Sequence, residues 1–410
     1  MTLQLDAGAA HIEIFAGGGG MAVGCQQAGF DASELHEIDT HCCHTLRHNA
    51  TSISPTIRGS VVEGDVREVD WEIRGTVSLL SGGAPCQPFS NAGRHEGHRD
   101  DRNLFPEVVR AVRVARPYAV VLENVKGILR EDFAPYLWYI LRQLSYPSIA
   151  RKKGEQWRSH SDRLLRHDCA KGSTPEYHVD IALLNAADYG VPQIRERVFI
   201  FATRADVLPP YTAAPPTHSR DALVAAQSDP AYWELRGLSA PKGAVNRTLG
   251  LGTTGLEPWV TVRDALAGLP PAATTEAESS FNHWMIPGAR AYTSHSGSQM
   301  DWPAKTIKAG VHGVPGGENT VVEDNGCFRY FTLRETARIQ SFPDHHVFSG
   351  RRIHVTRQIG NAVPCGLARA VAGPLRSVMA DYGLLRHANA APLMDDGYTG
   401  AAAFARAVAV

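Results

Sequence analysis

The sequence has little that would place it in a membrane, in a disulfide-stabilised class or among strongly basic proteins. No apolar run approaches the ~20 residues that span a bilayer, and the first residues lack a basic segment followed by an apolar one. The seven cysteines show no C-x-x-C pair, which argues against a disulfide framework and against structural zinc. The formal net charge is −1, so any surface for a polyanion must be local. We therefore expect a cytoplasmic protein that holds no metal.

The length and the proline distribution indicate two domains. The 410 residues suffice for a large domain and a smaller one, and the 43% hydrophobic content is typical of globular proteins. Proline pairs at 209–210 and 215–216 mark a change of character, after which strongly periodic segments become rare until about Phe331. We place the boundary near Leu208.

One cysteine lies in a stiff loop after a predicted strand. The apolar run 77–80 reads as a buried strand, and the glycines at 82–83 with Pro85 are expected to end it. Cys86 between Pro85 and Pro88 would then project from the carboxyl end of that strand, where open α/β sheets bind ligands. The alternative is a buried structural cysteine.

A glycine-rich turn and two acids lie at the ends of the first three predicted strands. Residues 12–15 read as a strand, 16–20 as the turn and 21–29 as a helix. Acids follow at Glu37 and Asp65, and Ile38 could pack on a flat base. Strands that alternate with helices, and that each end in a ligand-binding group, predict a doubly wound, mostly parallel α/β sheet with an adenosine-type cofactor. Because Gly17-x-Gly19-x-x-Ala22 also fits the dinucleotide fingerprint, a nicotinamide oxidoreductase remains open here, as does a turn without a ligand.

Charged side chains are expected near Cys86. Glu123 follows the predicted strand 118–122 and would emerge at the same sheet edge, where a carboxyl could act as an acid beside a nucleophile. Arg195 and Arg197 begin another predicted strand and would share one face. The alternatives are a capping carboxylate and a salt-bridged edge strand.

Three loops or insertions could contact a nucleic acid. The polar loop 91–102 could be a mobile lid or an ordinary surface loop. The segment 142–171 carries eight Lys or Arg against three acids, so it is either a phosphate-contacting insertion or a solvated helix with a basic face. The glycine-rich stretch 303–319 could offer donors and acceptors to base edges, or be a loop without function.

The order of these segments resembles the bacterial cytosine-5 DNA methyltransferases of the restriction-modification type over about residues 11–380. The segments that carry the resemblance are Phe15–Gly20, Pro85-Cys86-Gln87, Glu123-Asn124-Val125, Gln193-x-Arg195-x-Arg197, Arg334-Glu335 and Gln358–Pro364. The sequence departs from the family in two places: Ile38 replaces a larger aromatic, and the insertion 148–172 is longer than the family minimum. An oxidoreductase has no use for these segments.

The resemblance implies S-adenosylmethionine as methyl donor and a flipped cytosine in double-stranded DNA as substrate. Cys86 would be the nucleophile, Glu123 would hold a proton at ring nitrogen 3, and Arg197, with Arg195 nearby, would contact the base and orient Glu123. The expected cofactor-binding residues are Phe15, Gly17, Gly19, Gly20, Glu37, Ile38, Asp65, Val66, Pro85, Leu104, Asn361 and Ala362. The expected DNA-binding residues are Gln87, Ser90, Arg94, Arg99, Thr306, Lys308, His312, Glu318 and Asn319.

The resemblance also implies a division of labour along the chain. Residues 1–208, completed by about 345–385, would form the catalytic and cofactor-binding domain, 209–344 the target-recognition domain, and 386–410 a flexible tail. We expect a monomer on DNA, with a restriction endonuclease as a separate partner. The RNA-directed branch of the same family is the alternative, and the long second domain with its Thr306-Ile307 pair favours DNA.

Overall fold

The computed structural model describes residues 10–54, 60–72, 75–85, 104–241, 255–276, 281–291, 296–310 and 319–386. Their contacts divide the chain into two compact units. The first unit holds the described parts of Met1–Leu184, Glu196–Ala213 and Ala368–Ala391, and the second holds Asn185–Arg195 and the described parts of Ala214–Leu367. Residues 185–195 therefore belong to the second unit although they precede the expected boundary near Leu208. The chain lies in the first unit again at 196–213 and from residue 368.

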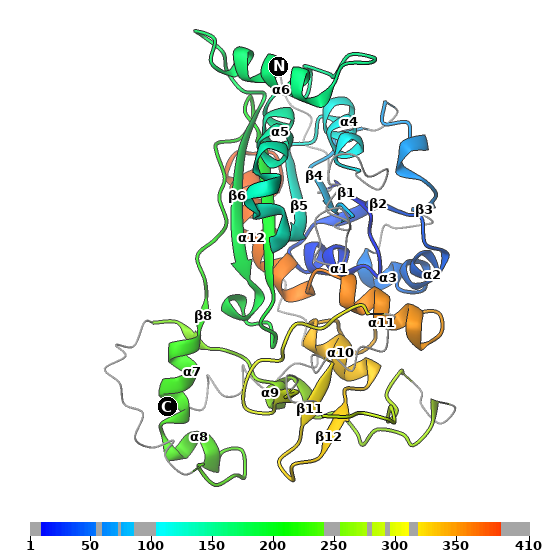
Figure 1. Ribbon diagram of the computed structural model, residues 1–410, viewed down its shortest axis with the longest axis vertical. Coiled ribbons are helices and arrows are strands. Elements are labelled where there is room, and N and C mark those ends of the chain that lie inside the picture. Colours follow the sequence, from blue (N-terminus) through cyan, green and yellow to red (C-terminus); the bar gives the residue numbers. More distant parts are fainter. Residues whose placement is uncertain are drawn as a thin grey trace. The chain divides into compact units, whose positions relative to one another are not determined.

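A seven-stranded sheet forms the centre of the first unit, with strands in the order β3-β2-β1-β4-β5-β7-β6 (Figure 1). The strands are β1 (Ala10–Ile14), β2 (Asp31–Glu37), β3 (Val61–Glu63), β4 (Leu79–Gly83), β5 (Ala119–Val125), β6 (Tyr177–Asn185) and β7 (Glu196–Arg204). The pairs among β1 to β5 are parallel, and β7 runs antiparallel to β5. The predicted doubly wound, mostly parallel α/β sheet is confirmed.

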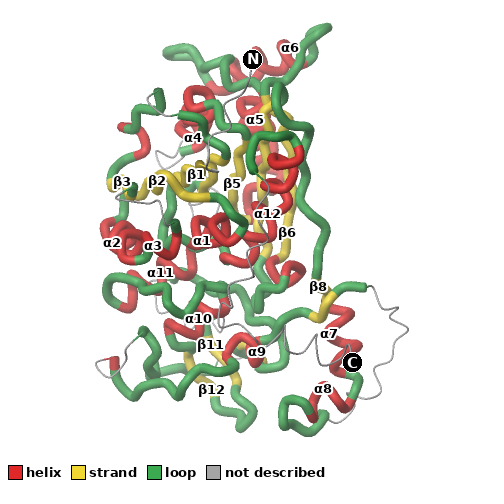
Figure 2. The backbone as a smooth tube through the Cα atoms, turned by 180° about the vertical axis from the view of Figure 1, so that it is seen from behind, coloured by secondary structure: helices red, strands yellow, loops and turns green. Residues whose placement is uncertain are grey.

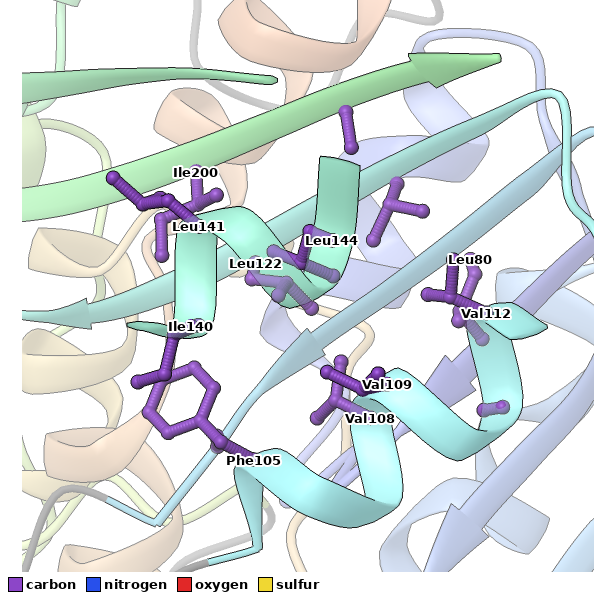
Figure 3. Close-up of a cluster of buried hydrophobic side chains, with 14 of the residues drawn as sticks. Leu80, Phe105, Val108, Val109, Val112, Leu122, Ile140, Leu141, Leu144 and Ile200 are labelled. Atoms are coloured by element: carbon purple, nitrogen blue, oxygen red, sulfur yellow. The ribbon is translucent and has the colours of Figure 1, made fainter. Parts of the chain in front are cut away.

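Helices pack on both faces of this sheet because successive strand residues point to opposite sides. On one face, α4 (Phe105–Ala115) and α5 (Ala134–Ser145) cover side chains such as Leu80, Leu122 and Ile200 (Figure 3). On the other face lie α1 (Gly20–Gln27) and α12 (Cys365–Asp381) (Figure 2). The remaining helices of the first unit are α2 (Thr40–His48), α3 (Ala50–Ile53), α6 (Trp157–Asp168) and the 3-10 turns η1 (Val66–Glu68), η3 (Lys126–Leu129) and η4 (Glu131–Phe133).

The strand before the cysteine loop extends further than the sequence suggested. We expected Gly82 and Gly83 to end it, but both belong to β4. A Cβ on Gly82 would lie 2.6 Å from the carbonyl oxygen of Ile14 in the neighbouring strand. Glycine at this position therefore permits close strand packing and does not break the strand.

The basic insertion lies at the amino end of β5. Glu176, just before β6, donates its backbone N–H to Ser145 at the end of α5, and the Tyr177 hydroxyl donates to the carbonyl of Pro117, two residues before β5 begins. The insertion is built around His160, whose ring bonds the Tyr139 hydroxyl at 2.9 Å and the Ile149 carbonyl at 2.7 Å. The two ends of the insertion thus lie at the end of the sheet opposite to Glu123.

The second unit is built of short elements. They are η5 (Ala186–Tyr189), β8 (His218–Ser219), α7 (Arg220–Gln227), α8 (Pro230–Glu234), β9 (Glu257–Pro258), α9 (Val262–Leu266), β10 (Ser298–Gln299), β11 (Thr320–Val322), β12 (Phe328–Tyr330), α10 (Leu333–Ile339) and α11 (Arg352–Asn361). β8 pairs with β9, and β10 to β12 form a three-stranded sheet. A capping box begins α10, since Thr332 and Glu335 exchange side-chain-to-backbone hydrogen bonds.

Within the described part of the chain, no helix is long and apolar enough to cross a membrane. The same residues contain no group of three or more His, Cys, Asp or Glu that could hold a metal ion.

Candidate active site

Glu123 and Arg197 form an ion pair at the carboxyl end of β5. The distance between Arg197 Nε and Glu123 Oε1 is 2.8 Å, and Glu123 is only 8% exposed. The register explains the contact: Arg197 lies opposite Val125, so Glu123 is its diagonal neighbour on the same face. The contact does not have hydrogen-bond alignment at Nε, so it is chiefly electrostatic. A positive charge at this distance fixes the direction of the Glu123 carboxyl group.

Gly83 and Asn124 connect this carboxylate to the start of the cysteine loop. Gly83 pairs with Glu123 across the sheet, and a Cβ on Gly83 would lie 3.2 Å from Glu123 Oε2. The buried Asn124 amide donates to the carbonyl of Ala84 at 3.1 Å. The chain leaves β4 through Ala84 and Pro85 toward Cys86, so Asn124 fixes the first step of that loop. The sequence alone assigns no role to Asn124.

The glycine-rich turn is tied to the acid at the end of β2. Glu37 Oε2 accepts the Gly17 N–H at 2.7 Å, while Oε1 accepts the N–H groups of Ile38 and Asp39 at 2.9 and 2.8 Å. A carboxylate has about four acceptor positions, so Oε2 keeps one for a ligand hydroxyl. Gly17 has φ +54°, and a Cβ there would meet nothing within 4 Å. The turn is therefore open on the side where a ligand would approach.

The other expected cofactor residues of the first unit lie around this turn. Ile38 is 65% exposed although it is apolar, as a side chain that packs on a flat ligand would be. Asp65 is engaged by Arg67, whose guanidinium lies 2.7 Å from Oδ2 and whose N–H lies 2.9 Å from Oδ1. The rest occupy the turn or loop ends: Phe15 (φ +59°), Gly19 (φ +88°), Gly20 at the start of α1, Val66 in η1, Pro85 after β4 and Leu104 before α4.

Thr306, Lys308 and Asn319 lie together in the second unit. The Asn319 amide accepts from the Lys308 N–H at 2.9 Å and donates to the Lys308 carbonyl at 3.0 Å. The Thr306 hydroxyl donates to the carbonyl of Ile194 at 2.8 Å. Asn361 and Ala362 end α11 in the same unit.

Comparison with known proteins gives one consistent result. The family model for C-5 cytosine-specific DNA methylase matches residues 9–146 and 160–377. The chain belongs to this family. It is 31% identical over 360 residues to the Type II methyltransferase M.NgoMIV of Neisseria gonorrhoeae, covering 88% of this chain and 95% of that protein. It is also 31% identical over 379 residues to M.Eco47II of Escherichia coli, covering 88% and 77% of the two chains.

A solved structure supports the fold. It is that of a prophage-encoded E. coli protein described as a DNA modification methyltransferase, with a TM-score of 0.54 and 21% identity, over 90% of this chain and 99% of that one. The protein is thus a DNA cytosine-5 methyltransferase that uses S-adenosylmethionine, as the resemblance implied. This excludes the oxidoreductase, and the family description and the relatives favour the DNA branch over the RNA-directed one.

The first unit of the methyltransferase fits S-adenosylmethionine. The cofactor has a ribose with two hydroxyls and a flat adenine, and the turn offers an oriented carboxylate on Glu37 beside the exposed side chain of Ile38. Gly17 leaves the approach unobstructed.

Arg195 differs from the expectation that it would lie beside Arg197 on one strand face. β7 begins at Glu196, and Arg195 belongs to the second unit. Its guanidinium is buried and donates to three backbone carbonyls, of Ile307 at 2.8 Å, Gly360 at 2.8 Å and Ala362 at 3.1 Å. Only Arg197 of the pair contacts Glu123 among the described residues.

A buried acid in β1, Glu13, was not among the residues that the sequence predicted for the site. Glu13 in β1 is 2% exposed, and burial followed by the charge of Glu37 raises the pKa of its carboxyl well above the usual value. The sequence signal for Glu13 was a single acid within the otherwise apolar predicted strand 12–15.

Several expected site residues lie outside the described residues. They are Cys86, Gln87, Ser90, Arg94, Arg99, His312 and Glu318.

Proposed function

We propose that the methyltransferase acts by covalent catalysis, with Cys86 as nucleophile and Glu123 as the group that holds the proton at ring nitrogen 3 of cytosine. The observation that carries the proposal is the buried Glu123–Arg197 pair at the end of β5, one strand from the point where β4 runs into the cysteine loop. Acid and nucleophile then share one sheet edge, which is the ligand-binding edge of open α/β sheets.

The chemistry requires both groups. Ring carbon 5 of cytosine is a poor nucleophile, and addition of the Cys86 thiolate to ring carbon 6 turns the ring into an enamine whose carbon 5 is nucleophilic. Glu123 stabilises the charge that develops on the ring by hydrogen bonding at nitrogen 3. After methylation, loss of the carbon 5 proton and departure of the Cys86 sulfur restore the aromatic ring. Carbon 6 is shielded in a stacked duplex, so the base must be flipped out.

Arg197 has two tasks in this scheme. It holds the Glu123 carboxylate in place, and its guanidinium has donors beyond Nε that can reach the carbonyl oxygen of the base. Arg195 acts differently, through the backbone carbonyls that it binds.

We propose that Glu37, Ile38 and the turn Phe15–Gly20 hold S-adenosylmethionine, with Asp65, Val66, Pro85, Leu104, Asn361 and Ala362 as further contacts. When bound, this cofactor supplies an electrophilic methyl group. Glu37 would accept a ribose hydroxyl at the acceptor position that its backbone bonds leave open, and Ile38 would pack against the adenine.

We propose that the second unit reads the DNA sequence, with Thr306, Lys308, His312, Glu318 and Asn319 at the protein–DNA contact. Gln87, Ser90, Arg94 and Arg99 would contact DNA from the segment after Cys86. The resemblance to Type II methyltransferases supports a role as the modification half of a restriction-modification system, beside a separate endonuclease. Such an enzyme would act as a monomer in the bacterial cytoplasm, at the nucleoid.

Mechanism-based trapping tests the nucleophile. DNA that carries 5-fluorocytosine in a methylated site should form a covalent adduct with the wild type that survives denaturation, because fluorine cannot leave as the carbon 5 proton does. Cys86→Ala should form no adduct and transfer no methyl group, while its affinity for S-adenosylmethionine stays at the wild-type value. Turnover by the purified variant would refute the assignment of Cys86.

A further inference from the structure

Three buried polar side chains of the second unit bind the backbones of two separate segments. Gln193, Arg195 and Gln340 are 0%, 1% and 0% exposed, and we call them the polar clamp. The two segments are 304–309, which contains proposed DNA contacts, and 359–362, which contains proposed cofactor contacts.

The clamp holds the first segment at Ile307. Gln193 Oε1 accepts the Ile307 N–H at 2.8 Å, and Arg195 donates to the Ile307 carbonyl at 2.8 Å. The backbone N–H and the backbone carbonyl of Ile307 are thereby both satisfied, by side chains of two residues that are two positions apart. The neighbouring backbone adds bonds from Ala304 to Pro192 and from Ile194 to Ala304, each 2.9 Å.

Arg195 also holds the second segment, together with Gln340. Arg195 donates to the carbonyls of Gly360 and Ala362, and Gln340 Nε2 donates to those of Ile359 at 2.5 Å and Ala362 at 3.2 Å. Gln193 Nε2 donates to Gln340 Oε1 at 2.7 Å, which joins the parts of the clamp into one network. Such a network fixes geometry strongly, because an unpaired group at its depth would be costly.

Gly360 brings the two segments into direct backbone contact. A Cβ on Gly360 would lie 2.3 Å from the Ala309 nitrogen and 2.5 Å from the carbonyl carbon of Lys308. These neighbours are backbone atoms, so they cannot rotate away as a side chain would. A displacement of one segment must therefore move the other.

We propose that the polar clamp and Gly360 are positioning elements that couple DNA-sequence discrimination to binding of S-adenosylmethionine. Segment 304–309 contains Thr306 and Lys308, and segment 359–362 contains Asn361 and Ala362. Arg195 bonds to both segments, and the bonded pair of Gln193 and Gln340 joins the first segment to the second. The inference rests on the proposed function of these two segments, and goes beyond it by assigning a role to residues that bind only the backbones of these segments and one another.

The test compares Gly360→Ala and Gln340→Met with Gln227→Met. Gln340→Met keeps the side-chain length and removes the amide, and serves where Gly360→Ala does not fold. Gln227 is the control: it is a half-buried glutamine of the same unit whose amide donates to the carbonyl of Asp301 at 2.7 Å, outside both segments. Folding of each variant is checked by thermal denaturation.

Two quantities are measured on each variant of the full chain. One is the dissociation constant of S-adenosylmethionine with and without cognate DNA, and the other is the ratio of methylation rates at the cognate site and at a site with one changed base pair. We expect both clamp variants to weaken cofactor binding and to lower the rate ratio together, each by roughly 5- to 150-fold. Gln227→Met should lose stability without changing either quantity.

The outcomes separate this inference from the proposed function. If Asn361→Ala leaves cofactor affinity unchanged, or Lys308→Ala leaves the rate ratio unchanged, the assigned role of that segment is wrong. If those direct variants act as expected while the folded clamp variants change only one quantity or neither, the coupling is refuted. An equal effect of Gln227→Met would show that any loss of a glutamine amide in this unit has the same effect, and would also refute the coupling.

Discussion

Glu123 is a buried carboxyl group that lies beside the positive charge of Arg197. Its carboxyl is nearly enclosed, and Arg197 at 2.8 Å fixes its direction toward the end of β5. Asn124 next to it anchors the backbone of Ala84, so consecutive residues orient the acid and the approach to the cysteine loop. A substitution here changes chemistry more than packing.

Glu123→Gln should lower the single-turnover rate of methyl transfer by about 10³–10⁴-fold, the upper half of the range for general acid–base groups. The amide keeps the size of the side chain but loses the charge that pairs with Arg197 and the capacity to hold the proton. Affinity for S-adenosylmethionine serves as the control and should remain unchanged. A wild-type rate at neutral pH would remove Glu123 from the mechanism.

Glu13 predicts a pH dependence of stability. Its pKa in the folded state is raised by burial, so the folded protein binds the proton more tightly than the unfolded chain does. The stability contributed by the protonated form is complete below the ordinary pKa of about 4.5 and is lost as pH rises through the raised value, at about 1.4 kcal/mol per pH unit.

Glu13→Gln should therefore gain stability over the wild type as pH rises from 5 to 8, since the amide does not titrate. Urea denaturation at several pH values measures the difference in the free energy of unfolding. A difference that does not change with pH would contradict the raised pKa.

At the scale of elements, the insertion between α5 and β6 is held by an internal network. His160 bonds Tyr139 and Ile149, and Trp157 packs edge-on against Tyr136 with ring centroids 5.3 Å apart. Arg163, one of its basic residues, pairs with Glu155 at 2.9 Å. The family model leaves 147–159 unmatched, and the insertion lies at the amino end of β5. We therefore expect its basic side chains to lie on a solvated face, away from the proposed DNA contact.

His160→Ala should lower the free energy of unfolding by about 1–3 kcal/mol, because the Tyr139 hydroxyl and the Ile149 carbonyl lose their partner. The exposed pair Lys152→Ala and Lys153→Ala is the matched comparison within the same insertion. It should leave stability within about 0.5 kcal/mol and leave DNA affinity and its salt dependence unchanged. A reduced salt dependence in the lysine variants would show that the insertion contacts phosphates after all.

At the scale of the whole molecule, the chain crosses between its two units at 184–185, 195–196, 213–214 and 367–368. The segment 185–195 connects β6 and β7 of the sheet but belongs to the second unit. There its residues Gln193 and Arg195 bind the backbone of Ile307. The proposed sequence-reading segment is thereby held by residues that come directly before β7.

Substitution of His312 or Glu318 by Ala should change which DNA sequences are methylated, or lower the rate at the cognate site alone. A bidentate contact to a base edge discriminates by roughly 1–3 kcal/mol, which is about 5- to 150-fold in rate. Asp221→Ala, at an exposed position of α7 in the same unit, is the control. Bisulfite sequencing of DNA methylated by each variant gives the site preference, and an unchanged preference and rate would place recognition elsewhere.

The sequence by itself determined the sheet class and the family. Strand-forming runs, the glycine-rich turn and the segments at Glu123, Gln193 and Gln358 depend on local patterns, and such patterns can be read from one chain. The acids at Glu37 and Glu123 were placed at strand ends because parallel strands share one carboxyl edge. Local patterns could not predict that β7 pairs with β5, or that β4 continues through Gly82. Both depend on which backbones approach each other, as at Gly82 and Ile14.

Only the tertiary structure decided which groups the two arginines contact. A two-residue spacing predicts one shared face, but Arg195 comes before β7 begins and binds carbonyls more than a hundred residues away, whereas Arg197 binds Glu123. The same holds for Gly360, whose lack of a side chain matters because Lys308 and Ala309 lie against it. Contacts of this kind join residues far apart in the chain, and no local pattern of hydrophobicity or spacing records them.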